Sequence, residues 1–215
     1  ACCPGNIARF IASVPGYVYA GKGRDVYVNL YAAGKGELKV SDNTVTITQK
    51  TRYPWEGDVA MTVDPSSECK FALKVRIPGW AQNTPVPSDL YKYMNESSEK
   101  PTLKLNGKPV ALAVDKGYVT LDRTWKKGDT IELNLPMPIR RVTANEEVEA
   151  DRGRVAVERG PMVFCAEWPD NNGKTHGLIL PDDTRLTSIL VKDMLGGIVV
   201  IKGCANAGMS SGEDT

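Results

Sequence analysis

The pattern of apolar positions at the start of the chain has the period of a helix. Pro4 suits the first turn of a helix, and Pro15 and Gly16 end it, because proline cannot continue the backbone hydrogen-bond ladder. Between them four apolar residues follow the i, i+3, i+4, i+7 spacing of one helical face: Ile7, Phe10, Ile11 and Val14. The sequence therefore predicts one short amphipathic helix.

From residue 25 onward the period changes to two, which is typical of β-strands. In DVYVNLYA (25–32), Val26, Val28 and Leu30 fall on one face, with Tyr27 and Tyr31 on the other. Similar alternation recurs in seven further segments: 44–49, 71–77, 102–110, 117–121, 130–135, 154–161 and 197–203.

Turn-forming residues separate these segments, as in NGK (106–108) and KGD (127–129), and the chain holds 20 glycines and 14 prolines. Many short strands divided by such turns favour an all-β fold. We predict an antiparallel β-sandwich, as one or two packed sandwiches, with a single short N-terminal helix.

Two polar stretches interrupt the strand pattern. Residues 81–101 are rich in proline and serine and are expected to form a long inserted loop. The acidic run at 145–153 is interpreted as a solvated loop within one sandwich in preference to a domain boundary. We accordingly divide the chain into four parts: a helical segment (1–16), a β-sandwich (17–145), further strands that complete it or begin a second one (146–203), and a polar tail expected to be disordered (204–215).

Charge and composition exclude some classes of partner. The chain of 215 residues has 27 Lys plus Arg against 26 Asp plus Glu, so no strong field attracts nucleic acid or an anionic membrane. No stretch approaches the roughly 18–20 apolar residues of a membrane span. The first 20 residues lack the pattern of a signal peptide, and we expect any export signal to lie outside this chain.

The candidate chemistry lies in two adjacent thiols. The chain has five cysteines, an odd number in a sequence too long to need a disulfide framework. Cys2 and Cys3 directly precede Pro4, where the unpaired N–H groups and dipole of the helix N-terminus favour thiolate. Such thiols suit a nucleophile or a metal ligand, but zinc takes four ligands and this pair supplies at most half. Two incidental thiols remain the alternative interpretation.

Six segments together resemble glycoside hydrolase family 127, the β-L-arabinofuranosidase-like enzymes. They occur in the family's order and span nearly the whole chain to about residue 203: CCPGNIARF (2–10), RYPWEGDV (52–59), VRIPGWA (75–81), LNGKPV (105–110), GYVTLDRTWKKGDTIELNLPMPIRRV (117–142) and VAVERGPMVFCAEWPDN (155–171).

The resemblance implies an upstream (α/α)6 barrel that carries the active site, with 1–16 as its last helix and β-sandwich domains packed on it. It implies a retaining mechanism in which Cys2 is the nucleophile and forms a thioglycosyl intermediate. Cys3 would be a zinc ligand, and zinc would also contact Cys2. A glutamate, a further cysteine ligand and the general acid/base would lie upstream, so we expect the isolated chain to be inactive and to lack zinc.

Two non-catalytic functions remain as alternatives: a carbohydrate-binding module, and a sandwich that braces the barrel. Tyr53, Trp55 and Trp80 are candidates for stacking on sugar, although aromatic residues beside proline or glycine at strand ends more often pack inside the protein. If the helix lacks its barrel, the stripe that contains Ile7 and Phe10 should be exposed.

Overall fold

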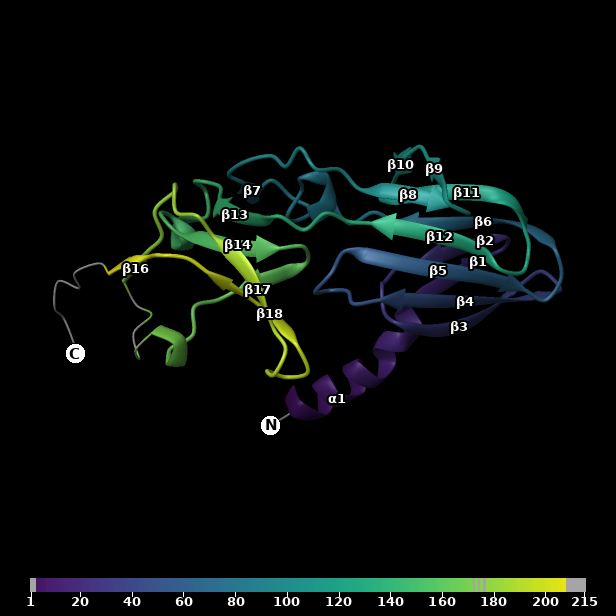
Figure 1. Cartoon of the computed structure of the whole chain (residues 1–215), viewed down its shortest axis with the longest axis horizontal. Coiled ribbons are helices and arrows are strands. Elements are labelled where there is room, and N and C mark those ends of the chain that lie inside the picture. The colour runs from purple at the N-terminus through teal and green to yellow at the C-terminus, as the bar shows by residue number, and fades with distance from the viewer. Residues whose placement is uncertain (1–2, 172, 174, 176, 208–215) are drawn as a thin grey trace. The chain divides into compact units, whose positions relative to one another are not determined.

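The computed structural model describes residues 3–171, 173, 175 and 177–207 (Figure 1). It confirms an all-β fold with one α-helix, α1 (Cys3–Ser13), and short 3₁₀ turns: η1 (Val14–Tyr17), η2 (Gly79–Gln82), η3 (Glu149–Asp151) and η4 (Pro169–Asn171). No helix in this described part has the length and apolarity that crossing a bilayer requires. The chain forms two compact units, one of residues up to 82 and 98–136, the other of 83–97 and the residues from 137 on.

The first unit contains two large sheets. One has the order β1-β2-β6-β11-β10, with bounds β1 (Tyr19–Lys22), β2 (Asp25–Val28), β6 (Cys69–Arg76), β11 (Tyr118–Trp125) and β10 (Val114–Asp115). The other has the order β3-β4-β5-β12-β8-β9, with bounds β3 (Gly34–Val40), β4 (Asn43–Thr51), β5 (Asp58–Pro65), β12 (Asp129–Asn134), β8 (Thr102–Leu105) and β9 (Lys108–Val110). All described strand pairs are antiparallel except β2 with β6, which is parallel.

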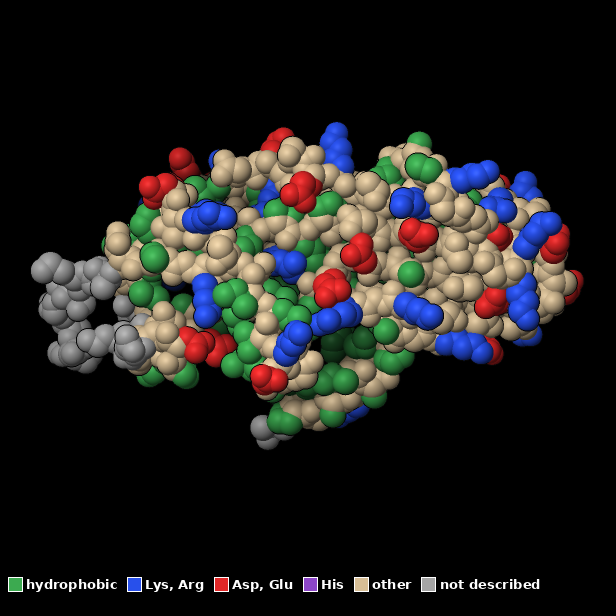
Figure 2. All heavy atoms as spheres, in the orientation of Figure 1, with side chains coloured by type: hydrophobic (Ala, Val, Ile, Leu, Met, Phe, Trp, Pro, Cys, Tyr) green, Lys and Arg blue, Asp and Glu red, His purple; other side chains and the backbone are tan. Residues whose placement is uncertain are grey.

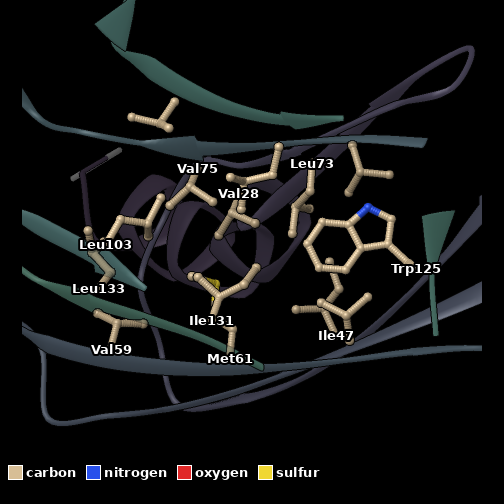
Figure 3. Close-up of a cluster of buried hydrophobic side chains, with 14 of the residues drawn as sticks. Val28, Ile47, Val59, Met61, Leu73, Val75, Leu103, Trp125, Ile131 and Leu133 are labelled. Atoms are coloured by element: carbon tan, nitrogen blue, oxygen red, sulfur yellow. The ribbon is translucent and has the colours of Figure 1, made fainter. Parts of the chain in front are cut away.

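Alternate residues of the two sheets bury one apolar core (Figure 3). Trp125 is completely buried, stacks on Phe71 with ring centroids 5.5 Å apart, and donates its indole N–H to the Phe71 carbonyl at 3.1 Å. That hydrogen bond satisfies the polar atom that burial would otherwise leave unpaired. The prediction that strand periodicity builds a sandwich is confirmed for this unit.

The strand predicted at residues 25–32 is shorter in the structure. β2 ends at Val28, so the expected strand 25–32 is four residues long, and the chain turns before Tyr31. Tyr31 is therefore buried, at 7% exposure, and its hydroxyl donates to the carbonyl of Arg76. The two-residue alternation could not place Tyr31 correctly because the strand had already ended.

The second unit contains smaller sheets. Its four-stranded sheet has the order β15-β14-β13-β7, with bounds β15 (Met162–Phe164), β14 (Val155–Arg159), β13 (Ile139–Ala144) and β7 (Tyr91–Tyr93). Two short ladders pair β16 (Leu178–Ile179) with β19 (Asn206–Ala207), and β17 (Thr187–Val191) with β18 (Ile198–Lys202). Of the buried apolar side chains among the described residues, Val142 alone lies in this unit.

The inserted segment 81–101 is not wholly a loop, since β7 pairs with β13 and residues 83–97 belong to the second unit. Three residues are too few for alternation to reveal a strand. The first unit ends at residue 136, so the division that we placed between residues 145 and 146 lies within the second unit. Of the predicted tail, 206–207 form β19, and 208–215 lie outside the described residues.

Gly57 marks a close approach between two backbone segments. Leu135 donates its backbone N–H to the Gly57 carbonyl at 3.0 Å, and a Cβ added to Gly57 would lie 1.8 Å from the Leu135 carbonyl oxygen. No rotamer change relieves a clash with backbone. The glycine in RYPWEGDV is thus required by packing.

We predict that Gly57→Ala destabilises the first unit by about 1–3 kcal/mol or more, because the two backbones must separate. Urea unfolding followed by circular dichroism measures the loss. Gly21→Ala is the matched control, since a Cβ at this β1 glycine would meet no atom within 4 Å. Equal stability of the two variants would contradict the packing role of Gly57.

Asp129 ties the turn between β11 and β12 to a neighbouring turn. Its carboxylate accepts from the Lys126 backbone N–H at 2.9 Å and from the Asn106 amide at 2.7 Å, and lies 3.7 Å from the Arg123 guanidinium. Burial alone would raise the pKa of Asp129. The hydrogen bonds and the Arg123 charge outweigh burial and hold that pKa below its ordinary value.

A carboxyl group with a lowered pKa stabilises the fold fully above its ordinary pKa of about 3.9. That stabilisation is lost as the pH falls through the folded-state pKa. We therefore predict that Asp129→Asn lowers stability at pH 7 by about 1.5–3 kcal/mol, because a donor amide replaces a charged acceptor. As the pH falls below about 4, the stability of the variant should decrease less than that of the unmodified chain. Urea unfolding of both proteins at pH 7 and pH 3 measures both effects. An equal loss of stability in the two proteins between these pH values would contradict the role given to the Asp129 carboxylate.

Candidate functional site

The cysteine pair lies at the beginning of α1. The helix starts at Cys3, with Pro4 in its first turn as the sequence predicts, and Cys3 is exposed. Cys2, the candidate nucleophile, lies outside the described residues. The structure thus places Cys3 at a helix N-terminus, where backbone N–H groups stabilise negative charge.

The apolar stripe of α1 is exposed. Ile7, Phe10 and Ile11 are 57%, 63% and 63% exposed, and no residue of the helix is buried. Figure 2, in the orientation of Figure 1, shows hydrophobic side chains gathered over α1. Leaving one large apolar side chain in water costs about 1.5–3 kcal/mol relative to burial, so this face suits contact with another surface.

The C-terminal end of α1 leads directly into the first sandwich. After η1, Val18 accepts hydrogen bonds from the backbone N–H groups of Asn29 at 2.9 Å and Leu30 at 3.4 Å. The Asn29 side chain also donates to the Tyr17 carbonyl at 3.4 Å. These hydrogen bonds join the C-terminal end of the helix to the sandwich, and Cys3 lies at the other end.

The three aromatic candidates for sugar stacking lie near the first sandwich. Tyr53 and Trp80 pack against its core, and all three residues, including Trp55, are half-buried. Tyr53 meets the buried ring of Tyr31 edge-on, with centroids 5.7 Å apart, and burial raises the pKa of Tyr53. This arrangement supports packing for Tyr53 and Trp80. By contrast Trp168, in the second unit, is 59% exposed.

The described residues fit zinc in donor type but not in number. Thiolate is among the ligands that zinc prefers, and Cys3 is accessible. Within the described ranges, however, no three His, Cys, Asp or Glu side chains gather closely enough to hold a metal ion. His176, the one histidine of the sequence, is outside those ranges. A four-ligand site at Cys3 therefore needs donors that this part of the chain does not supply.

The sequence interpretation missed a polar cluster in the second unit. Tyr93 donates its hydroxyl to Glu158 at 2.9 Å, and the Arg140 guanidinium lies 3.3 Å from the centre of the Tyr93 ring and donates to the Asn95 carbonyl at 2.6 Å. Burial and the Glu158 hydrogen bond raise the pKa of Tyr93, and burial lowers that of Arg140. The cross-strand pairing of Arg140 with Glu158 could have indicated part of this cluster only once the register was known. Its hydrogen bonds fasten β7 to the sheet.

Comparison with known proteins gives matches along most of the chain. Residues 25–137 match "Beta-L-arabinofuranosidase, GH127 middle domain", and residues 139–201 match "Glycoside hydrolase family 127 C-terminal domain". A curated relative, the non-reducing end β-L-arabinofuranosidase of Bifidobacterium longum subsp. longum, is 36% identical over 208 residues. That alignment covers 92% of this chain and 28% of the relative.

Solved structures agree with these matches. A GH127 β-arabinofuranosidase is 45% identical with a TM-score of 0.90, over 96% of this chain and 32% of that chain. The GH127 β-L-arabinofuranosidase Ara127N of Geobacillus stearothermophilus T6 is 35% identical with a TM-score of 0.84, over 100% of this chain and 32% of that one. The chain thus spans about a third of the length of these structures.

We predict that Phe10→Lys leaves the stability of this 215-residue chain within about 0.5 kcal/mol, because the ring is already mostly in water. In a polypeptide extended upstream, the same change should cost about 1.5–3 kcal/mol or more if another domain covers the helix. Urea unfolding of both forms measures the difference. Arg9→Lys, on the same helix, is the control that keeps the charge. A large loss in the short chain would show that its own residues cover Phe10.

Proposed function

The chain belongs to glycoside hydrolase family 127, and on this premise we propose that it is the C-terminal part of a glycosidase acting on β-L-arabinofuranosides or related glycans. Matches over 25–137 and 139–201 support the family, and the names of the relatives suggest the substrate class. In this proposal the active site is completed by a helical barrel that precedes Cys3 in the same polypeptide.

The observation that carries the proposal is the joint placement of a thiol and an apolar face on α1. Cys3 lies at the free end of the helix, and Ile7 and Phe10 expose their side chains along it. A surface that covers this face would also surround the thiols and exclude water from them. The helix therefore suits a shared element between a sandwich and a second domain.

In the proposed reaction Cys2 is the nucleophile. Its thiolate attacks the anomeric carbon, so that a C–S bond forms as the glycosidic C–O bond breaks. The departing oxygen takes a proton from an upstream carboxylic acid. Water, deprotonated by the same carboxylate, then attacks the anomeric carbon and releases the Cys2 thiolate, which gives net retention of configuration.

Cys3 is proposed as a zinc ligand, beside Cys2. Zinc, when bound, would supply a positive charge that keeps the thiols deprotonated at neutral pH. The helix N-terminus adds a smaller favourable field for the same anionic state. Because Cys3 follows Cys2 directly, the peptide link itself holds the ligand and the nucleophile next to each other.

The alternative proposal is a non-catalytic sandwich, either a carbohydrate-binding module or a brace for the barrel. Tyr53 and Trp80 are half-buried and pack against the core, which weakens the first version. A brace is compatible with catalysis by the longer polypeptide, but it gives no role to the paired thiols.

We predict that Cys2→Ser in the upstream-extended polypeptide lowers kcat on nitrophenyl β-L-arabinofuranoside by at least about 10³-fold, because an alcohol is a far weaker nucleophile than a thiolate at neutral pH. Cys3→Ser should lose activity together with bound zinc, measured by elemental mass spectrometry. The isolated chain should show neither turnover nor stoichiometric zinc.

Cys69→Ser is the matched control, since this thiol is half-buried in β6 of the first unit and has no place in the proposed site. It should leave activity unchanged. Full turnover by the Cys2→Ser variant would exclude the nucleophile. Turnover and zinc in the isolated chain would show that no upstream part is needed.

A further inference from the structure

The second unit has little to hold its two groups of strands together. Its four-stranded sheet and its two short ladders are separate sheets, and Val142 is the one buried apolar side chain of the unit among the described residues. Arg141 of β13 connects the sheet to the segment between β16 and β17, by donating to the carbonyls of Thr184 at 2.6 Å and Pro181 at 3.4 Å. Domains with so small a core often rely on a covalent cross-link.

An open pocket of about 530 Å³ lies within this unit, and two thiols line it. Its walls come from β14 and β15 of the four-stranded sheet and from β16 and β18 of the short ladders. Cys165 directly follows β15, and Cys204 lies between β18 and β19. Both thiols are exposed, and they are the two cysteines that the sequence has in this unit. One pocket thus brings together thiols from the sheet and from the ladders.

The local structure on each side holds these cysteines at the pocket but leaves them room to move. Phe164 pairs with β14, so Cys165 leaves the end of a paired strand. On the other side the Thr184 hydroxyl donates to the Cys204 carbonyl at 3.2 Å. Neither cysteine is itself part of a strand. A disulfide needs Cα atoms about 4.4–6.8 Å apart, and the two segments can approach each other without breaking a ladder.

A metal ion suits the two thiols less well than a covalent bond does. Zinc takes at least three protein ligands, and within the described residues no third His, Cys, Asp or Glu side chain gathers with them. A disulfide needs the two thiols alone. The pair is therefore suited to oxidation.

We propose that Cys165 and Cys204 form a disulfide that fastens the short ladders to the four-stranded sheet. The bond would close a loop that contains β16, β17 and β18. In the chain-entropy account, closing such a loop reduces the freedom of the unfolded chain and so stabilises the folded unit. The inference concerns the second unit only and does not depend on the chemistry proposed for Cys2.

The oxidant in this reaction is a small disulfide such as oxidised glutathione. One of the two protein thiolates attacks it, which forms a mixed disulfide and releases one glutathione thiolate. The second protein thiolate then attacks the protein sulfur of the mixed disulfide and releases the other glutathione. The two protein thiols lose two electrons and two protons, which reduce the oxidant to two thiols.

We predict that oxidised glutathione at about pH 8 converts Cys165 and Cys204 of the upstream-extended polypeptide into one internal disulfide. Trypsin places the two cysteines on different peptides, 160–174 and 203–215, so mass spectrometry without reduction detects a linked pair. In the oxidised form the amide hydrogens of β17 and β18 should exchange about tenfold more slowly than in the reduced form, because the bond restricts local opening.

Lys192→Cys in a Cys204→Ser background is the matched control. Lys192 is exposed and lies at the tip of the β17–β18 hairpin, at the opposite end from Cys204. The introduced thiol should form a mixed disulfide with glutathione but no bridge to Cys165. Cys69→Ser, in the first unit, should leave the bridge intact.

Separate glutathione adducts on Cys165 and Cys204, without a linked pair, would overturn the proposal. An equally frequent bridge to the thiol introduced at residue 192 would also overturn it, because the pocket would then have no part in the pairing. A linked pair with unchanged hydrogen exchange would contradict the fastening role. None of these measurements reads zinc or turnover, so the result is separate from the test of the glycosidase chemistry.

Discussion

The burial of a single apolar core between two sheets is the constraint on which the first unit depends. Every second residue of β4, β5, β6 and β12 faces this core, and their remaining side chains are mostly polar. The outer faces carry exposed ion pairs such as Lys104 with Glu132 and Lys70 with Asp122. Each such pair adds little stability, but together they keep the outside of the sandwich soluble. Among the described residues, most large apolar side chains of the two sheets are used in this core.

The same reasoning explains why α1 and the second unit differ from the sandwich. α1 leaves Ile7, Phe10 and Ile11 in water, and the second unit has one buried apolar side chain in its described part. Both patterns are typical of surfaces that are buried against another protein surface. Protein interiors are close-packed, so an apolar face of this size is stable only against a complementary surface. Both features therefore suit contact with a further surface.

Prediction from the sequence succeeded where the periodic signal was long enough. The 3.6-residue spacing of Ile7, Phe10 and Ile11 identified α1, and the NGK turn is realised between β8 and β9, where Asn106 and Gly107 have positive φ. β5 carries the same alternation and could have been found in the same way. β3, which is polar and rich in glycine and lysine, and β7, with three residues, do not have a detectable period. Their positions depend on long-range pairing, which one sequence cannot supply.

The candidate site shows a related limit. Helix-forming residues and the Cys-Cys-Pro sequence were enough to place Cys3 at a helix N-terminus, because both signals are local. Zinc coordination and acid/base catalysis depend on groups brought together by tertiary structure, and local signals cannot identify them. A helix that is attached to the sandwich near Val18 and apolar along its length can present its free end inside a second domain. Thiols at that end would then be fixed in position by two domains at once, and a nucleophile needs this kind of positioning to act on a bound sugar.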